Sequence, residues 1–298
     1  MMQVKKAVFP VAGLGSRFLP VTKATPKEML PIVDKPLIQY AVEEAVRAGI
    51  THMIFITSSS KRAIEDHFDN HFELELRLFE QGKNELLQLV QSISPPGIQF
   101  TYVRQHQPLG LGHAILSAQH VIGDDPFAVL LADDLIDDQH SPCLTAMVNH
   151  FEQDHLSVLA VQPVPWSEVH HYGVVDVRDV SCAYSKINDI VEKPARNVAI
   201  SNLAAVGRYV FTREIFSSLA QTSKDHRGEI QLTDGIQRLL QRENVYAFQF
   251  NGKRFDCGSK LGYLQAMVEF GLRHVEIGSA FSDYLRGLDC GDGVRSFL

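Results

Sequence analysis

Short apolar runs alternate with amphipathic segments along the first half of this chain, and this alternation limits the folds open to it. The apolar runs, which we expect to be buried strands, are Ala7–Val11, Met53–Thr57, Ile98–Val103 and Phe127–Leu131. The segments between them with helical spacing are Ile38–Ala48, Lys61–Phe68 and Ala114–His120. Because parallel strands need crossover connections, this order predicts an α/β fold with a mixed, mostly parallel sheet flanked by helices.

The alternation of strand-like and helix-like segments changes in the second half of the chain. Short strand-like segments without long helices between them occur at Ser157–Pro163, Gly173–Val177 and Ile187–Val191. We expect mixed or antiparallel strands there, within the same domain. Strands at Leu203–Phe211 and Val245–Phe250 follow, with a helix at Thr233–Gln241 between them. The segment from Leu261 to His274 predicts a helix outside the sheet, so we expect a C-terminal helical extension.

Composition excludes several classes of partner. The chain has 298 residues, 45% of them hydrophobic and 21% charged, and a formal net charge of −7, as in an ordinary globular protein. This mild acidity argues against non-specific binding to nucleic acid or to an anionic membrane. The four cysteines, Cys143, Cys182, Cys257 and Cys290, lack metal-site spacing, and residues 1–6 lack the apolar stretch of a signal peptide. We expect reduced thiols and a cytoplasmic location.

A glycine turn follows the first predicted strand. Gly13 and Gly15 allow backbone N–H groups to approach a phosphate, and the cations Arg17 and Lys27 follow soon after. Arg17 offers a planar fork for phosphate oxygens, and Lys27 a compact charge. Phe18 stands where a dinucleotide fingerprint needs a third glycine. The alternative is a tight turn followed by solvated surface charges.

Carboxylates follow two predicted strands. Asp133 comes just after Phe127–Leu131, at the sheet edge where open α/β folds bind ligands, and it suits Mg²⁺. Asp256 is a second candidate, after Val245–Phe250. For Asp134 we expect a different role, as the cap of a following helix.

Polar residues at two further strand ends could contact a ligand. Gln105 follows Ile98–Val103, and its amide can match a pyrimidine edge; a polar loop residue beside the helix start at Gly110 is the alternative. Glu192 and Lys193 follow Ile187–Val191. Adjacent strand residues point to opposite faces, so both can reach one ligand only if the chain bends, for which Pro194 gives a reason. A surface ion pair is the alternative reading.

The chain resembles the bacterial UTP–glucose-1-phosphate uridylyltransferases over nearly its whole length, in a set of short segments that occur in a fixed order. The matching segments are Pro10–Gly15, Pro26–Pro31, Asp34–Tyr40, Val103–Gln105, Gly110–Ala114, Tyr172–Val175, Glu192–Pro194, Ala205–Tyr209, Glu229–Asp234 and Asp256–Tyr263. The resemblance implies a Rossmann-like nucleotidyltransferase domain, which we place at residues 4–268, and a helical tail at 269–298 that could serve oligomerisation.

The resemblance also implies roles for individual residues. The nucleotide would be held by Ala12, Gly13, Leu14, Gly15, Gln105 and Gly110, with the triphosphate on Arg17 and Lys27. Gly173 and Glu192 would bind glucose, and Lys193 its phosphate. Asp133 and Asp256 would hold Mg²⁺.

The implied reaction joins UTP and glucose 1-phosphate to give UDP-glucose and pyrophosphate, by in-line attack on the α-phosphorus. A homodimer or homotetramer is implied as well, without nucleic-acid or membrane partners. Two alternatives stay open at this point. One is the same chemistry with dTTP or another sugar 1-phosphate, and the other is an inactive regulatory paralogue.

Overall fold

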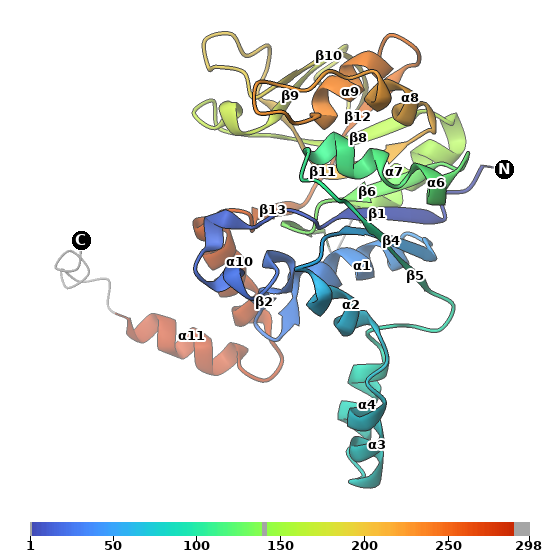
Figure 1. The fold of residues 1–298 in the computed structure, drawn as a ribbon. Helices are drawn as coiled ribbons and strands as arrows, with labels where there is room; N and C mark the ends of the chain where they lie inside the picture. Colours follow the sequence, from blue (N-terminus) through green and yellow to red (C-terminus); the bar gives the residue numbers. More distant parts are fainter. Residues whose placement is uncertain (1, 139–141, 289–298) are drawn as a thin grey trace.

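A mixed nine-stranded sheet forms the centre of the fold in the computed structural model, which describes residues 2–138 and 142–288 (Figure 1). The strands of its first half, in spatial order, are β5 (Gln99–Arg104), β4 (His52–Thr57), β1 (Lys6–Pro10) and β6 (Phe127–Leu130). Those of its second half are β11 (Leu203–Phe211), β8 (Ser157–Pro163), β12 (Val245–Gln249), β10 (Tyr184–Glu192) and β9 (Gly173–Val177).

The two halves of the sheet differ in strand direction. In the first half β1 runs parallel to both β4 and β6, with Val8 opposite Ile54 and Val129, and β4 runs parallel to β5. In the second half only β8 and β12 pair in parallel, whereas β11, β10 and β9 pair antiparallel with their neighbours. The mixed sheet is confirmed, but its parallel share is smaller than predicted. One reason is that β9 and β10 are joined by a connection too short for a parallel crossover, so they form an antiparallel hairpin.

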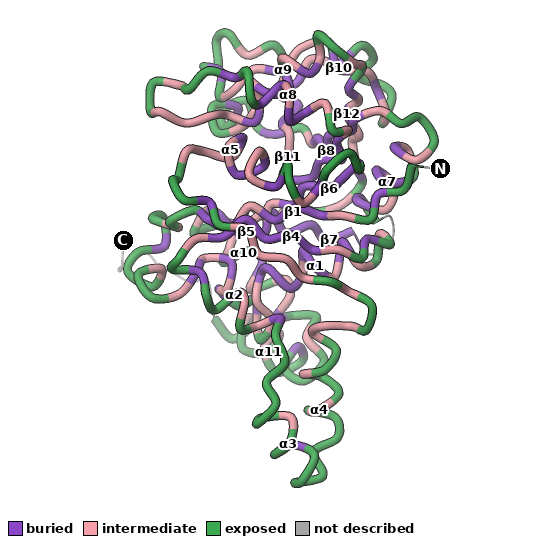
Figure 2. The backbone as a smooth tube through the Cα atoms, turned by 45° about the vertical axis from the view of Figure 1, so that its right-hand side comes forward, coloured by how far each residue is buried: buried purple, intermediate pink, exposed green. Residues whose placement is uncertain are grey.

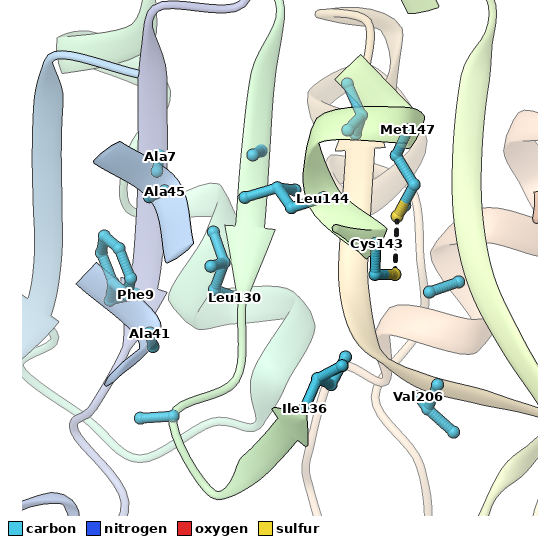
Figure 3. Close-up of a cluster of buried hydrophobic side chains, with 14 of the residues drawn as sticks. Ala7, Phe9, Ala41, Ala45, Leu130, Ile136, Cys143, Leu144, Met147 and Val206 are labelled. Carbon is cyan, nitrogen blue, oxygen red and sulfur yellow. Dashed lines mark hydrogen bonds between the residues drawn. The ribbon is translucent and has the colours of Figure 1, made fainter. Parts of the chain in front are cut away.

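Helices cover both faces of the sheet, as predicted. Along β1, Ala7 and Phe9 point to one hydrophobic cluster and Val8 to the other, because side chains alternate along a strand. Three helices pack on the first face: α1 (Leu37–Arg47), α2 (Arg62–Phe68) and α7 (Cys143–Asp154). Four pack on the second: α5 (Leu111–Leu116), α6 (Gln119–Ile122), α8 (Glu214–Ala220) and α9 (Leu232–Leu239). Figure 3 shows the first face, where Ala41 and Ala45 of α1 lie beside β1.

A smaller layer packs beside the main sheet. It contains a two-stranded sheet of β7 (Asp134–Asp137) and β13 (Lys253–Asp256), a short hairpin of β2 (Pro31–Ile32) and β3 (Lys35–Pro36), and the helix α10 (Lys260–Arg273). Phe18, Leu37, Leu135 and Phe255 share its hydrophobic core. The Ser259 side chain caps α10 by accepting from the Gly262 N–H at 3.1 Å. The helix α11 (Gly278–Gly287) follows and extends away from the body (Figure 1).

A helical hairpin that was not predicted from the sequence projects from the lower end of the molecule (Figure 1). Its helices are α3 (Phe72–Glu80) and α4 (Asn84–Gln91), and Figure 2 shows most of it exposed. Both helices are amphipathic, but Phe72 and Phe79 are 78% and 68% exposed. The hairpin packs mainly on itself, so it contributes little to the core near the sheet.

Several other predictions need correction. The predicted helix 114–120 is two short helices that begin at Leu111. Asp134 caps no helix, because it begins the strand β7, and Asp256 ends the separate strand β13. The predicted boundary at 268/269 falls inside α10, and residues 289–298 of the predicted tail lie outside the described residues.

Within the described ranges no helix is both long and apolar enough to cross a membrane. Cys143, Cys182 and Cys257 are free thiols, and Cys290 is outside the described residues.

Candidate functional site

A cleft of about 730 Å³ opens where the parallel strands end and the second half of the sheet begins. Eight of the predicted site residues line it: Gly15, Arg17, Lys27, Asp133, Gly173, Glu192, Lys193 and Asp256. Five others do not line it: Ala12, Gly13, Leu14, Gln105 and Gly110. The sheet topology therefore gathers into one cavity residues as far apart in the chain as Gly15 and Asp256.

Lys27 and the two candidate metal ligands meet on one side of the cleft. Lys27 Nζ donates to Asp133 Oδ2 at 2.6 Å. Burial alone would lower the pKa of Lys27 and raise that of Asp133. Their mutual attraction outweighs burial, so the pKa of Lys27 lies above its ordinary value and the pKa of Asp133 below. Both side chains are thus held in their charged forms.

The position of Gly258 shows how close the two carboxylates are. A β-carbon on Gly258 would lie 2.9 Å from both Asp133 Oδ2 and Asp256 Oδ1. Only a glycine leaves the space between the two oxygens open. Arg17 reaches the same place, with Nη1 3.5 Å from the Gly258 carbonyl oxygen.

This pair of carboxylates fits a magnesium ion completed by substrate. Among the described residues no group of three or more His, Cys, Asp or Glu side chains could hold a metal. Mg²⁺ is commonly bound by one or two carboxylates together with substrate phosphates and water. Two hard oxygens facing one small space, beside Arg17 and Lys27, match that pattern.

A buried ion pair holds the turn that carries Lys27 in place. The neighbouring Glu28 accepts from Lys61 Nζ at 2.8 Å, and both side chains are almost fully buried. Lys61 immediately precedes α2, so the pair ties the turn that carries Lys27 to a helix of the main domain. Burying two charges is costly, and removing one partner alone typically destabilises a protein by about 3–5 kcal/mol.

Asp134, whose capping role was wrongly predicted, belongs to a buried network. Its carboxylate accepts from the Arg254 guanidinium, and Arg254 also donates to the Tyr172 hydroxyl at 3.3 Å. The guanidinium lies 5.0 Å from the centre of the Tyr172 ring. The Asp134 backbone carbonyl accepts from Arg208 Nη2 at 2.8 Å. Both aspartates line the cleft, but their partners differ: Asp133 pairs with Lys27, and Asp134 joins β7 to β13 through Arg254.

Arg208 anchors the wall of the cleft from inside the core. It is 1% exposed and donates to both carboxylate oxygens of Glu44 on α1, at 2.7–3.0 Å. Its remaining N–H groups donate to the carbonyl oxygens of Leu131, Gly207 and Asp134. Every donor of this buried cation is used, which fixes the strand end from which Asp133 projects.

A bend in the backbone brings Glu192 and Lys193 to the same cleft. Glu192 ends β10, and Lys193 has a φ of +43°, in the left-handed region that non-glycine residues rarely adopt. The turn directs both side chains to the cleft, where Lys193 Nζ lies 2.7 Å from Glu192 Oε1. The predicted bend at this position is thus confirmed, and the strain sits on Lys193 itself.

Gly173 and Thr233 complete the surroundings of Glu192. Thr233 Oγ1 donates to Glu192 Oε2 at 2.6 Å. A β-carbon on Gly173 would lie 2.8 Å from Thr233 Oγ1, too close for the present arrangement. Gly173 is therefore needed for the contact that orients the Glu192 carboxylate.

The predicted base-binding residues lie beside the cleft. Gln105 follows β5 and is 8% exposed, and its Nε2 donates to the Gly110 carbonyl oxygen at 3.2 Å. Gly110 and Gly112 pack against the segment that leads into α9. A β-carbon on Gly110 would lie 2.9 Å from the Ile230 oxygen, and one on Gly112 would lie 2.8 Å from it. These glycines permit close packing within the protein, whereas a β-carbon on Gly13 would meet nothing within 4 Å.

Several polar residues of the cleft were not predicted from the sequence. Four of them are Tyr172, Glu229, Thr233 and Arg254. All four lie in or beside segments that match the family, so the resemblance of these segments could have indicated them as site residues. Their chemistry depends on partners far away in the sequence, such as Asp134 for Arg254, and spacing alone does not reveal these partners.

Known proteins match this chain over most of its length. The family model described as "Nucleotidyl transferase" matches residues 6–271. A UTP–glucose-1-phosphate uridylyltransferase of Bacillus subtilis is 49% identical over 288 residues, which cover 97% of this chain and 98% of that protein. The enzyme of the same name from Escherichia coli is 50% identical, with 95% of each chain covered. A solved structure, a UTP-bound UGPase from Acinetobacter baumannii, superposes with a TM-score of 0.89 at 44% identity, covering 96% of this chain and all of that one.

Proposed function

This chain belongs to the nucleotidyl transferase family, among its UTP–glucose-1-phosphate uridylyltransferases, and we propose that the cleft described above is the site of their reaction. The chain is an enzyme that transfers the uridylyl group of UTP to glucose 1-phosphate, giving UDP-glucose and pyrophosphate. The relatives favour this activity over an inactive regulatory role. One observation carries the assignment of the site: a single cleft contains Arg17 and Lys27 together with Glu192 and Lys193.

The reaction brings together two anions that repel each other. At an effective dielectric constant near 20, two unit charges about 4 Å apart repel by roughly 4 kcal/mol. Arg17 and Lys27 bind the triphosphate of UTP and offset part of this charge. Lys193 binds the phosphate of glucose 1-phosphate, and Glu192, oriented by Thr233, accepts hydrogen bonds from the sugar hydroxyls.

The chemistry needs no covalent group from the protein. A phosphate oxygen of glucose 1-phosphate attacks the α-phosphorus of UTP in line, the new P–O bond forms, and the bond to the β-phosphate oxygen breaks as pyrophosphate leaves. The side chains hold the two substrates in this alignment and stabilise the charge on the oxygens around the α-phosphorus.

Enzymes of this family generally act with a divalent metal, and we propose Mg²⁺, held by Asp133 and Asp256 together with substrate phosphates. When bound, the ion would neutralise phosphate charge and draw electron density from the α-phosphorus. Lys27 is positioned beside the same carboxylate, so it can move toward phosphate oxygens while Asp133 turns to the ion.

We place uracil between the glycine turn and β5. Ala12, Gly13 and Leu14 lie on one side of this space, and Gln105 and Gly110 on the other. The open space at Gly13 supports this placement, because the protein itself does not require a glycine there.

We also propose that the chain forms a homo-oligomer through its C-terminal helices, α10 and α11. Leu261, Leu264, Val268 and Leu272 lie on one face of α10 and are 68%, 60%, 38% and 40% exposed. Light scattering after size exclusion would test this, because Leu264→Glu should lower the mass if the face is an interface.

Since UTP is a cytosolic metabolite and three thiols are free, we place the reaction in the cytoplasm.

The activity is tested by incubating the purified protein with Mg²⁺, glucose 1-phosphate and either UTP or dTTP. We expect UDP-glucose and pyrophosphate in equal amounts with UTP, less product with dTTP, and none after EDTA treatment. A preference for dTTP would keep the chemistry but change the nucleotide. A folded sample that releases no pyrophosphate with either nucleotide would refute the assignment.

A further inference from the structure

The side-chain amide of Gln105 is held in one orientation. Gln105 follows β5, and its backbone N–H donates to the Thr57 carbonyl oxygen at the end of β4, at 2.9 Å. Its Nε2 donates to the Gly110 carbonyl oxygen at 3.2 Å and lies 2.9 Å from Nδ1 of His113 on α5. An amide nitrogen carries two hydrogens, so these two contacts use both of them.

The Gly110 carbonyl settles which amide atom is the nitrogen. A carbonyl oxygen can only accept, so turning the amide over would place two oxygens against each other. With Nε2 donating, Nδ1 of His113 must accept, and the imidazole is neutral with its proton on Nε2. Burial, and to a lesser extent the positive charge of Lys224, lower the pKa of His113 and favour this neutral form.

The other amide atom, Oε1 of Gln105, is left to accept from a ligand. No described residue donates a hydrogen bond to it, and it is not among the side-chain oxygens that are sealed in the interior without a partner. Gln105 is thus presented as an acceptor alone, since both of its donors are used inside the protein.

The spacing of the strands suits a pyrimidine at this place. β4 separates β5 from β1, so Gln105 and the glycine turn after β1 are two strand spacings apart, about 10 Å. A pyrimidine ring with a hydrogen bond at each edge fills such a gap. Leu111, next to Gly110, lines the cleft and adds an apolar surface beside it.

We propose that His113 is a positioning residue that holds the Gln105 amide so that its oxygen accepts from the N3–H of uracil, which selects uridine over cytidine nucleotides. This deepens the proposed function and rests on it. Cytosine has a lone pair at N3 where uracil has N–H, so it would face the Gln105 oxygen with a second acceptor. Thymine shares the N3–H of uracil, so this contact does not distinguish dTTP from UTP.

Two substitutions at position 113 separate positioning from mere packing. His113→Leu keeps apolar volume but removes one of the two acceptors, so that only the Gly110 carbonyl oxygen still holds the Gln105 amide and the amide can rotate away from its bound orientation. His113→Asn returns an acceptor oxygen near the place of Nδ1. His120→Leu, at an exposed histidine on α6, is the matched control.

The measurement is equilibrium binding of UTP, dTTP and CTP by titration calorimetry, with the full-length protein, Mg²⁺ and no sugar phosphate. We expect His113→Leu to weaken UTP and dTTP binding in parallel by about tenfold, the effect of one hydrogen bond, and to leave CTP binding nearly unchanged. The ratio of UTP to CTP affinity then falls by about the same factor. His113→Asn should restore most of the ratio, and His120→Leu should not change it.

Two results of this titration would overturn the proposal. An unchanged UTP-to-CTP ratio in His113→Leu would overturn the proposal, even if all affinities fell, because that is the result of a purely structural role. A wild-type protein that binds UTP and CTP equally would overturn it as well. Binding is measured without turnover, so a protein that selects UTP but makes no UDP-glucose would refute the proposed function and leave this inference standing.

Discussion

Replacing Lys193 by alanine removes one cation from the cleft with little effect on the rest of the fold. Its side chain is 49% exposed and its ammonium pairs with Glu192 at 2.7 Å, and exposed pairs of this kind contribute about 0–1 kcal/mol to stability. Alanine must adopt the same left-handed φ of +43°, so the backbone strain is similar in the variant. We therefore expect the free energy of unfolding to change by about 1 kcal/mol or less.

The effect on catalysis should be much larger. One unit charge about 4 Å from a phosphate charge contributes roughly 4 kcal/mol at an effective dielectric constant near 20, which corresponds to about 10³ in rate. Because Lys193 is half exposed, solvent screening reduces this value. We expect kcat/KM for glucose 1-phosphate to fall by about 10² to 10³, with the Kd for UTP within about threefold of wild type.

The assay follows pyrophosphate release at varied glucose 1-phosphate and saturating UTP, with UTP binding measured separately. Lys35→Ala is the matched control, because Lys35 also forms a partly exposed pair at 2.9 Å, with Glu43, away from the cleft. Lys193→Arg keeps the charge and should recover part of the activity. A Lys193→Ala enzyme with kcat/KM within about threefold of wild type would refute the assignment of the sugar phosphate to Lys193.

Three further substitutions test other parts of the site. Asp133→Asn should lower kcat by about 10² or more and raise the Mg²⁺ concentration for half-maximal rate; an unchanged Mg²⁺ dependence would exclude Asp133 as a ligand. Gly173→Ala, whose β-carbon would crowd Thr233 Oγ1 at 2.8 Å, should raise KM for glucose 1-phosphate about tenfold without weakening UTP binding, and a weaker UTP affinity would contradict this. Glu44→Gln leaves Arg208 buried without a counter-charge and should lower the free energy of unfolding by about 3–5 kcal/mol in urea titrations; a loss below about 1 kcal/mol would show that the pair is not needed.

The position of Asp133 could be predicted because it depends on local pattern. A buried apolar run such as Phe127–Leu131 predicts a strand, and parallel strands share a carboxyl edge. Whatever follows such runs must gather there, and the structure brings Asp133 together with Arg17 and Lys27. Proximity of these residues therefore followed from strand order, before any side-chain contact was known.

The role of Asp134 could not be predicted, because its partner lies 120 positions away. In the sequence it differs from Asp133 by one position, and helix capping was a reasonable local interpretation. In the structure its partner is Arg254, on the strand β13. No short-range pattern in the sequence predicts that β13 pairs with β7. Both aspartates line the cleft, so the long-range ion pair with Arg254, and not a place away from the cleft, distinguishes Asp134 from Asp133.

The region around Lys193 lies between these cases. The sequence required a bend for Glu192 and Lys193 to meet one ligand, and Pro194 suggested one. It did not indicate that Lys193 itself would take a positive φ. Such strain persists only where the surrounding structure fixes it, here through the Lys193 N–H, which donates to the Tyr172 carbonyl oxygen at 2.9 Å.

A crystal structure with UDP-glucose and Mn²⁺, a metal located by its anomalous scattering, tests the central claim most directly. The account predicts Mn²⁺ bound by Asp133 and Asp256, the uracil N3–H on Gln105 Oε1, and the glucosyl group against Glu192. Nucleotide bound outside this cleft, or Mn²⁺ bound by neither aspartate, would contradict it.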